Sequence, residues 1–79
     1  MAEPSPTDAN SAARFRANLQ GEVDSAGLYR ALSETEADPK ISEVYLRLSA
    51  VEEAHAQFWR GQLEKIGAKA GSLRPPLFS

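Results

Sequence analysis

The dipeptide Asp38-Pro39, near the middle of the 79-residue chain, is the strongest constraint on its fold. Aspartate caps a helix by accepting hydrogen bonds from the free backbone amides of its first turn. Proline is tolerated at the first position of a helix but disrupts a helix interior. The dipeptide therefore predicts that one helix ends before Asp38 and that a second helix begins at Pro39.

Positions that recur at steps of three and four residues flank this boundary on both sides. They are Phe15, Leu19, Glu22, Ala26, Tyr29 and Ser33 before it, and Ile41, Tyr45, Leu48, Glu52, His55, Trp59, Leu63 and Ile66 after it. Such steps place side chains on one face of a helix with about 3.6 residues per turn. We therefore expect helices over about residues 11–37 and 39–67, the second closed by Gly67.

The two ends of the chain lack this periodicity. Residues 1–10 are rich in Pro, Ser, Thr, Asp and Asn, which predicts a disordered N-terminal arm. Residues 68–79 contain Gly71 and the pair Pro75-Pro76, so we expect a C-terminal tail or linker there. The expected domain is residues 11–67.

Two long helices joined by a short connection pack antiparallel to one another. A chain of this length buries little surface by itself, and a lone hairpin leaves part of each apolar stripe exposed. We therefore expect an all-α fold in which an antiparallel two-helix hairpin dimerises into a four-helix bundle, or forms a higher homo-oligomer.

The composition excludes several classes of function. The absence of cysteine excludes disulfides, thiolate zinc sites and cysteine nucleophiles. Nine basic and eleven acidic residues give a net charge of -2, so the chain lacks the basic surface that nucleic acid requires. The first residues, Met-Ala-Glu-Pro-Ser-Pro, have neither the basic nor the apolar region that signal peptides carry, and no stretch of the sequence approaches about 20 apolar residues, so we expect a soluble, cytoplasmic protein.

Three residues with metal-binding side chains, Glu22, Glu52 and His55, fall on the predicted stripes. Glu52 and His55 form a Glu-x-x-His motif, whose side chains lie one turn apart on one helical face. Glu22 lies sixteen residues before Asp38 and Glu52 fourteen after it, so an antiparallel hairpin brings them to nearly the same height. Because buried carboxylates without a partner are costly, we predict that the three residues bind metal.

Mixed carboxylate and imidazole ligands favour iron, manganese or zinc over calcium or magnesium. Three ligands are too few for two ions, whereas two hairpins related by a two-fold axis supply four glutamates and two histidines. We therefore expect two iron ions per dimer at a site between subunits, with manganese or zinc as alternatives.

The sequence around these ligands resembles the first half of a rubrerythrin-type ferritin-like domain. The resemblance covers about residues 14–67 and rests on Leu19-Gln20-Gly21-Glu22, on Tyr29 and on Val51-Glu52-Glu53-Ala54-His55-Ala56. Such domains occur in membrane-bound ferritins fused to vacuolar iron transporter modules. The spacing of the ligands and Tyr29 is also similar to that in encapsulated ferritins, whose chains are short two-helix hairpins.

The resemblance implies a ferritin-like bundle with a di-iron ferroxidase centre, which oxidises ferrous iron with dioxygen in iron storage, detoxification or delivery to an export module. It implies that Glu22 and Glu52 bind iron, one of them as a bridge, that His55 is a terminal ligand and that Tyr29 lies beside them. It also implies an encapsulin shell or a fused membrane transporter as partner, and hence a location inside a shell or on the cytosolic side of a membrane protein. Full ferritin-like domains carry a second pair of helices with another Glu-x-x-His motif, so this chain needs a partner to complete the site.

Several residues also have simpler interpretations. Glu52 and His55 alone could form a hydrogen-bonded pair that fixes the helix register. Tyr29 and Trp59 lie near the ligands, but aromatic residues on such a stripe are usually core. Glu53 points about 100° away from Glu52, so we place it, with Tyr29 and Trp59, beside the ligands rather than among them.

Other interpretations concern the C-terminal tail and the function of the whole chain. The segment Gly71-Ser72-Leu73-Arg74 resembles the peptide by which cargo docks into encapsulin shells, although a plain linker is the simpler interpretation. Two alternatives to a ferroxidase are an iron-sensing module whose dimerisation is driven by metal, and a metal-free helical interaction module.

Overall fold

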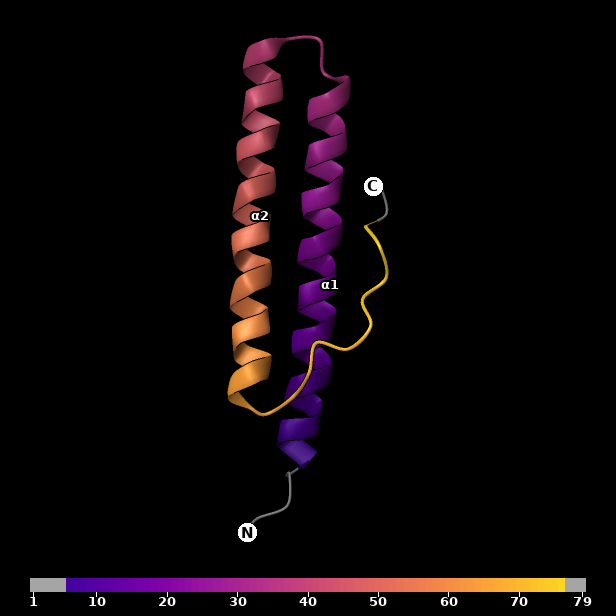
Figure 1. Cartoon of the computed structure of the whole chain (residues 1–79), viewed down its shortest axis with the longest axis vertical. Coiled ribbons are helices and arrows are strands. Elements are labelled where there is room, and N and C mark those ends of the chain that lie inside the picture. Colours follow the sequence, from indigo (N-terminus) through magenta and orange to yellow (C-terminus); the bar gives the residue numbers. More distant parts are fainter. Residues whose placement is uncertain (1–5, 77–79) are drawn as a thin grey trace.

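The computed structural model describes residues 6–76, in which the chain forms two α-helices, α1 (Pro6–Thr35) and α2 (Pro39–Lys65), and no strand. The helices lie antiparallel, and the segment after α2 turns back along α1 (Figure 1). The molecule is a narrow rod of 57 × 18 × 14 Å. The predicted all-α hairpin is thus confirmed. In this part of the chain, neither helix has the length and hydropathy needed to cross a membrane.

The start of α2 agrees with the sequence. Asp38 is the N-cap, and its side chain accepts a hydrogen bond of 2.9 Å from the backbone amide of Lys40. Pro39 is the first helical residue. The cap satisfies an amide that has no partner within the helix, so α1 and α2 are separated at the predicted boundary.

Helix α2 ends at Lys65, and the chain reverses direction at Gly67. Gly67 has φ 72°, a conformation that glycine adopts without strain. Its amide donates to the Glu64 carbonyl at 3.0 Å, and the amide of Ala68 donates to the Leu63 carbonyl at 2.9 Å. These two bonds form a Schellman motif, so Gly67 closes the helix as the sequence indicates.

Helix α1 departs from the prediction at both ends. It begins at Pro6, so residues 6–10 are helical rather than part of a disordered arm. Proline at the first helical position removes no hydrogen bond, because the first four amides of a helix have no partner within it. The rest of the predicted arm, residues 1–5, lies outside the described residues. The helix ends at Thr35, two residues earlier than expected.

The core between the helices is thin and built largely from small side chains. Among the side chains that the structure describes, the buried apolar residues are Ala12, Leu19, Ala26, Ala56 and Leu63. The hydroxyl of Ser49 donates to the Ala26 carbonyl at 2.9 Å. The hydroxyl of Ser42 donates to the Ser33 carbonyl at 2.8 Å. Small residues let the helix backbones approach, and the serines hydrogen-bond across that close contact.

Two aromatic pairs span the helices on either side of the middle of the hairpin. Phe15 and Trp59 have ring centroids 5.5 Å apart, and Tyr29 and Tyr45 have centroids 6.4 Å apart. Glu22 is seven residues from Phe15 and seven from Tyr29, and Glu52 is likewise seven residues from Trp59 and Tyr45. Because seven residues make about two helical turns, the two glutamates occupy the level midway between the aromatic pairs.

The predicted stripe on α2 is rotated in the structure. Ile41 and Leu48, which the sequence placed on the inner face, are 45% and 36% exposed. Ser49 and Ala56 are buried against α1 in their place. The thin core explains the difference, because small residues allow the close helix approach that bulky residues at the same positions would prevent. The larger apolar side chains of α2 therefore lie to one side of the helix contact.

The segment after α2 packs against α1 instead of leaving the hairpin as a free linker. Arg74 forms an ion pair with Asp24, with nitrogen–oxygen distances of 2.9 and 2.5 Å. The amide of Arg74 donates to the Gln20 side chain at 3.0 Å, and the Gln20 amide group donates back to the Arg74 carbonyl at 3.1 Å. Pro76 lies so close to Gly27 that a Cβ there would be 2.5 Å from the proline ring. The last part of the predicted tail, residues 77–79, lies outside the described residues.

Candidate metal centre

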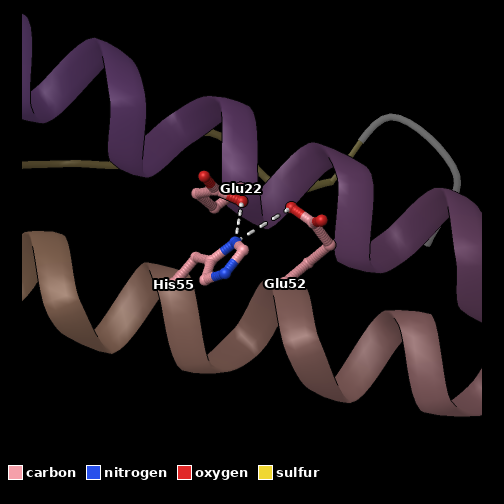
Figure 2. Close-up of side chains that lie close together, drawn as sticks. All are labelled: Glu22, Glu52 and His55. Carbon is pink, nitrogen blue, oxygen red and sulfur yellow. Dashed lines mark ion pairs between the residues drawn. The ribbon is translucent and has the colours of Figure 1, made fainter.

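The structure brings the three predicted ligands together in the middle of the hairpin. Glu22 projects from α1 toward Glu52 and His55, which project from successive turns of α2 (Figure 2). One donor atom from each residue can be chosen so that all lie within 4.8 Å of one another. His55 Nδ1 lies 3.5 Å from Glu22 Oε2 and 3.9 Å from Glu52 Oε2. The Glu-x-x-His motif and the glutamate across the hairpin thus form one cluster.

The ligands differ in their exposure to solvent. The side chains of Glu22 and Glu52 are 22% and 21% exposed, whereas that of His55 is 54% exposed. The glutamates lie at the level between the two aromatic pairs, where the helix contact shields them. His55 lies one turn further along α2 and toward the outside. The cluster is therefore closed on the hairpin side and open on the other.

The two carboxylates perturb one another. A hydrogen bond between the Glu52 and Glu22 side chains, which protonated Glu52 donates, raises the pKa of Glu52, and burial and the charge of Glu22 raise it further, while His55 lowers it. Two acids that face each other at short range favour a shared proton over two negative charges. A cation bound between them would replace that proton and relieve the repulsion, so this pair of glutamates is suited to binding metal.

The dimensions and chemistry of the cluster fit a metal ion of the predicted kind. Bonds from carboxylate oxygen or imidazole nitrogen to such ions are about 2.0–2.2 Å, so two donors on one ion lie at most about 4.4 Å apart. The distances of 3.5 and 3.9 Å from His55 to the two acids fall within this limit. Carboxylate and imidazole donors suit iron, manganese and zinc. Glu22, Glu52 and His55 would hold such an ion with coordination positions left open.

A shallow hollow lies beside the cluster. Its volume is about 380 Å³, and its lining residues are Ala17, Asn18, Gly21, Glu22, Ser25, Glu52 and Trp59. Asn18 and Ser25 lie one turn before and one turn after Glu22 on α1, so they were recognisable from their spacing but were not predicted. The hollow gives small molecules a route to the carboxylates from the open side of the hairpin.

The three residues predicted to lie beside the ligands have different surroundings. Trp59 lines the hollow next to both glutamates. Tyr29 stacks on Tyr45, about two turns from Glu22, and is not among the residues that line the hollow. Glu53 points away from the cluster and pairs with Arg30 of α1. Of the three, only Trp59 is placed to influence the site directly.

A second hollow of about 450 Å³ lies next to the C-terminal segment, where Gly27, Arg30, Glu53 and Pro76 are among its lining residues. Glu53 and Arg30 form an ion pair there. It contains none of the three clustered ligands. Although it is the larger of the two, its chemistry gives no reason to place the metal there.

No family model matches this chain, and no curated protein or solved structure matches it either. The assignment of the site therefore depends on the geometry and donor chemistry of Glu22, Glu52 and His55. The resemblance to ferritin-like domains stays a prediction.

Proposed function

We propose that this protein is a di-iron ferroxidase whose site forms between two copies of the chain, as part of a ferritin-like four-helix bundle. It would oxidise ferrous to ferric iron in iron storage, detoxification or delivery to an export module. The observation that carries the proposal is the convergence of two half-buried carboxylates and an imidazole, from two helices, with one donor atom of each within 4.8 Å of the others.

The carboxylates provide a reason for oxidation as well as for binding. The attraction between a carboxylate and an ion grows with the charge of the ion, so Glu22 and Glu52 would hold ferric iron more strongly than ferrous iron. In the proposed reaction, two ferrous ions lose one electron each. Dioxygen accepts both electrons with two protons and leaves as hydrogen peroxide. The hollow beside the glutamates is the route by which dioxygen would arrive.

A second copy is part of the proposal because one hairpin supplies only three donors. Two copies related by a two-fold axis would supply four carboxylates and two imidazoles, which is the ligand complement of carboxylate di-iron bundles. The exposure of the His55 side chain, 54%, supports this arrangement, because it leaves the ligand accessible to a partner.

Native mass spectrometry after anaerobic loading with ferrous iron, followed by measurement of iron oxidation in air, tests the proposal. We expect two iron ions per dimer and oxidation faster than in protein-free buffer. An iron-sensing module would bind the iron without accelerating its oxidation. A metal-free interaction module would show the same oligomer and melting temperature with and without iron.

A further inference from the structure

The larger of the two hollows lies on a different side of the hairpin from the metal cluster. It has a volume of about 450 Å³ and shares no lining residue with the hollow beside Glu22 and Glu52. Gly27, which lines it, lies five residues after Glu22 and so about 140° around α1. Small-molecule sites in proteins commonly enclose about 300–1,000 Å³. The hollow is therefore large enough for a small organic ligand.

A close contact between α1 and the segment after α2 forms one wall of this hollow. Pro76 packs on Gly27 so closely that a Cβ at residue 27 would lie 2.5 Å from the Cβ of the proline. Two residues earlier, Arg74 is held by its ion pair with Asp24 and by two hydrogen bonds to Gln20. The segment thus runs along α1 (Figure 1). Because these contacts fix the wall, the hollow is a built feature of three parts of the chain.

The floor of the hollow is apolar, and its polar groups are more exposed. Ala26 of α1 and Ala56 of α2 are buried, and Val23 is packed against the core beside them. The polar side chains of the lining, all exposed, are Arg30, Glu53, Gln57 and Arg60, and we call these four residues the rim. An apolar floor with a few polar groups at its edge suits a ligand that has an apolar body and a polar end.

The charges of the rim favour an anion. Arg30 and Arg60 carry two positive charges and Glu53 carries one negative charge, so the rim has a net charge of +1. Arg30 pairs with Glu53, whereas the side chains of Arg60 and Gln57 form no hydrogen bond or ion pair within the described part of the chain. Gln57 and Arg60 are three residues apart, which places them one turn from each other on α2. Both can therefore donate to the same acceptor group.

We propose that this hollow binds a small organic monocarboxylate, whose apolar body lies on the floor and whose carboxylate accepts hydrogen bonds from Arg60 and Gln57. The planar guanidinium group of arginine matches the two oxygens of a carboxylate. A single negative charge also balances the rim, whereas a phosphate ester carries about -1.5 to -2 at neutral pH. The site is additional to the proposed function, because it contains none of the three clustered metal ligands.

Titration of the isotope-labelled full chain, followed by NMR with chelator present, tests the proposal. The probe is 1-naphthoate, which joins one carboxylate to a rigid apolar body. We expect it to shift the side-chain N–H signals of Gln57 and Arg60 saturably, with a dissociation constant of about 1 mM or lower. The alcohol 1-naphthalenemethanol has the body without the charge, and acetate and inorganic phosphate have the charge without the body. Each of these three should bind at least about fivefold more weakly than 1-naphthoate.

Two substitutions on the rim should change the affinity for 1-naphthoate in opposite directions. Arg60→Gln removes the unpaired charge and should weaken binding at least about fivefold. Glu53→Gln removes the acid that competes for Arg30 and raises the net charge of the rim to +2, so it should strengthen binding at least about twofold. Arg14→Gln is the matched control, because Arg14 is also exposed, lines neither hollow and has no side-chain partner among the described residues. All three positions are exposed, so circular dichroism should show intact helices in every variant.

The outcome does not depend on iron, because chelator is present and the metal ligands are unchanged. The absence of saturable shifts, equal binding of 1-naphthoate and its alcohol, or equal affinities in wild type and Arg60→Gln would each overturn the inference. Phosphate that binds as tightly as 1-naphthoate would also overturn it, since the apolar floor would then have no role. None of these results would affect the ferroxidase proposal, and binding with the expected pattern would stand even if that proposal failed.

Discussion

His55 Nδ1 lies 3.5 Å from Glu22 Oε2, although the two residues belong to different helices. This contact is closer than that between His55 and Glu52 of its own helix, at 3.9 Å. A metal ion between these atoms would therefore connect α1 to α2 at the middle of the hairpin. Changes to the three ligands should affect metal binding and stability in different ways.

His55→Ala should abolish stoichiometric binding of ferrous iron and leave the hairpin folded. The change removes a ligand, and even residues outside the ligand set often alter metal affinity by about 10–100-fold. Because the His55 side chain is 54% exposed, we expect its loss to change the free energy of unfolding by no more than about 0.5 kcal/mol. Anaerobic native mass spectrometry and thermal unfolding measure the two effects. Gln57→Ala, at an exposed position of the same helix, serves as the control and should still bind iron.

Glu52→Gln should stabilise the metal-free protein near neutral pH while weakening iron binding. The pKa of Glu52 is raised in the folded state, chiefly by the hydrogen bond with Glu22, so the folded chain holds this proton more tightly than the unfolded chain does. This contribution to stability is complete below the ordinary pKa of glutamate and is lost as the pH rises through the raised value. The amide of glutamine carries no charge at either pH, so the variant avoids that loss.

Thermal unfolding of both proteins with chelator, at about pH 4 and about pH 7, checks the Glu52→Gln prediction. The melting temperature of the variant relative to wild type should be higher at the neutral pH than at the acidic pH. A difference independent of pH would show that the repulsion between Glu22 and Glu52 does not operate in solution.

The elements and the cluster were predictable because each depends on local chemistry or on simple counting. Asp38 and Pro39 mark a helix start by their own hydrogen bonding and backbone geometry. The level positions of Glu22 and Glu52 follow from equal rise along two antiparallel helices. These features need no knowledge of how the side chains pack.

The features that the sequence did not reveal depend on packing over long distances. Burial of Ser49 and Ala56 in place of Leu48 follows from the close approach of the helices, which no pattern in α2 alone specifies. The contact between Arg74 and Asp24 joins residues fifty positions apart, and nothing in the composition of the tail predicts it. The early start of α1 at Pro6 was missed because the Pro and Ser content of the first residues resembles that of disordered chains.

Leu19→Ala should destabilise the hairpin strongly. Leu19 is fully buried. Among the described residues, Leu63 is the only other large side chain that is fully buried. Removing a buried leucine typically costs about 2–5 kcal/mol, because apolar contacts are lost and a cavity remains. Leu46, which is 51% exposed, provides the matched control, and Leu46→Ala should cost less than about 0.5 kcal/mol. Urea unfolding measures both, and equal costs would contradict the thin core described above.

Gly27→Ala should release the C-terminal segment from α1 without disturbing the metal cluster. The new Cβ would lie 2.5 Å from the Cβ of Pro76, so the segment must move, whereas the helix itself tolerates alanine well. Hydrogen exchange at the Arg74 amide, which donates to Gln20, should become at least about tenfold faster because the hydrogen bond opens more often. Gly61→Ala, where the new Cβ meets nothing within 4 Å, should leave this exchange unchanged.

Iron binding by Gly27→Ala completes the same experiment, because Gly27 and Arg74 lie on the side of α1 away from Glu22. We expect wild-type stoichiometry from the variant, as measured by native mass spectrometry.

The interpretation of Gly71-Ser72-Leu73-Arg74 as a cargo peptide gives a further prediction. A shell could bind this peptide only after the contacts of Arg74 with Gln20 and Asp24 open. The Gly27→Ala variant should then bind an encapsulin shell more tightly than wild type does. Equal binding of the two proteins, with the segment shown to be released, would leave the segment as a strap on α1 and not a docking peptide.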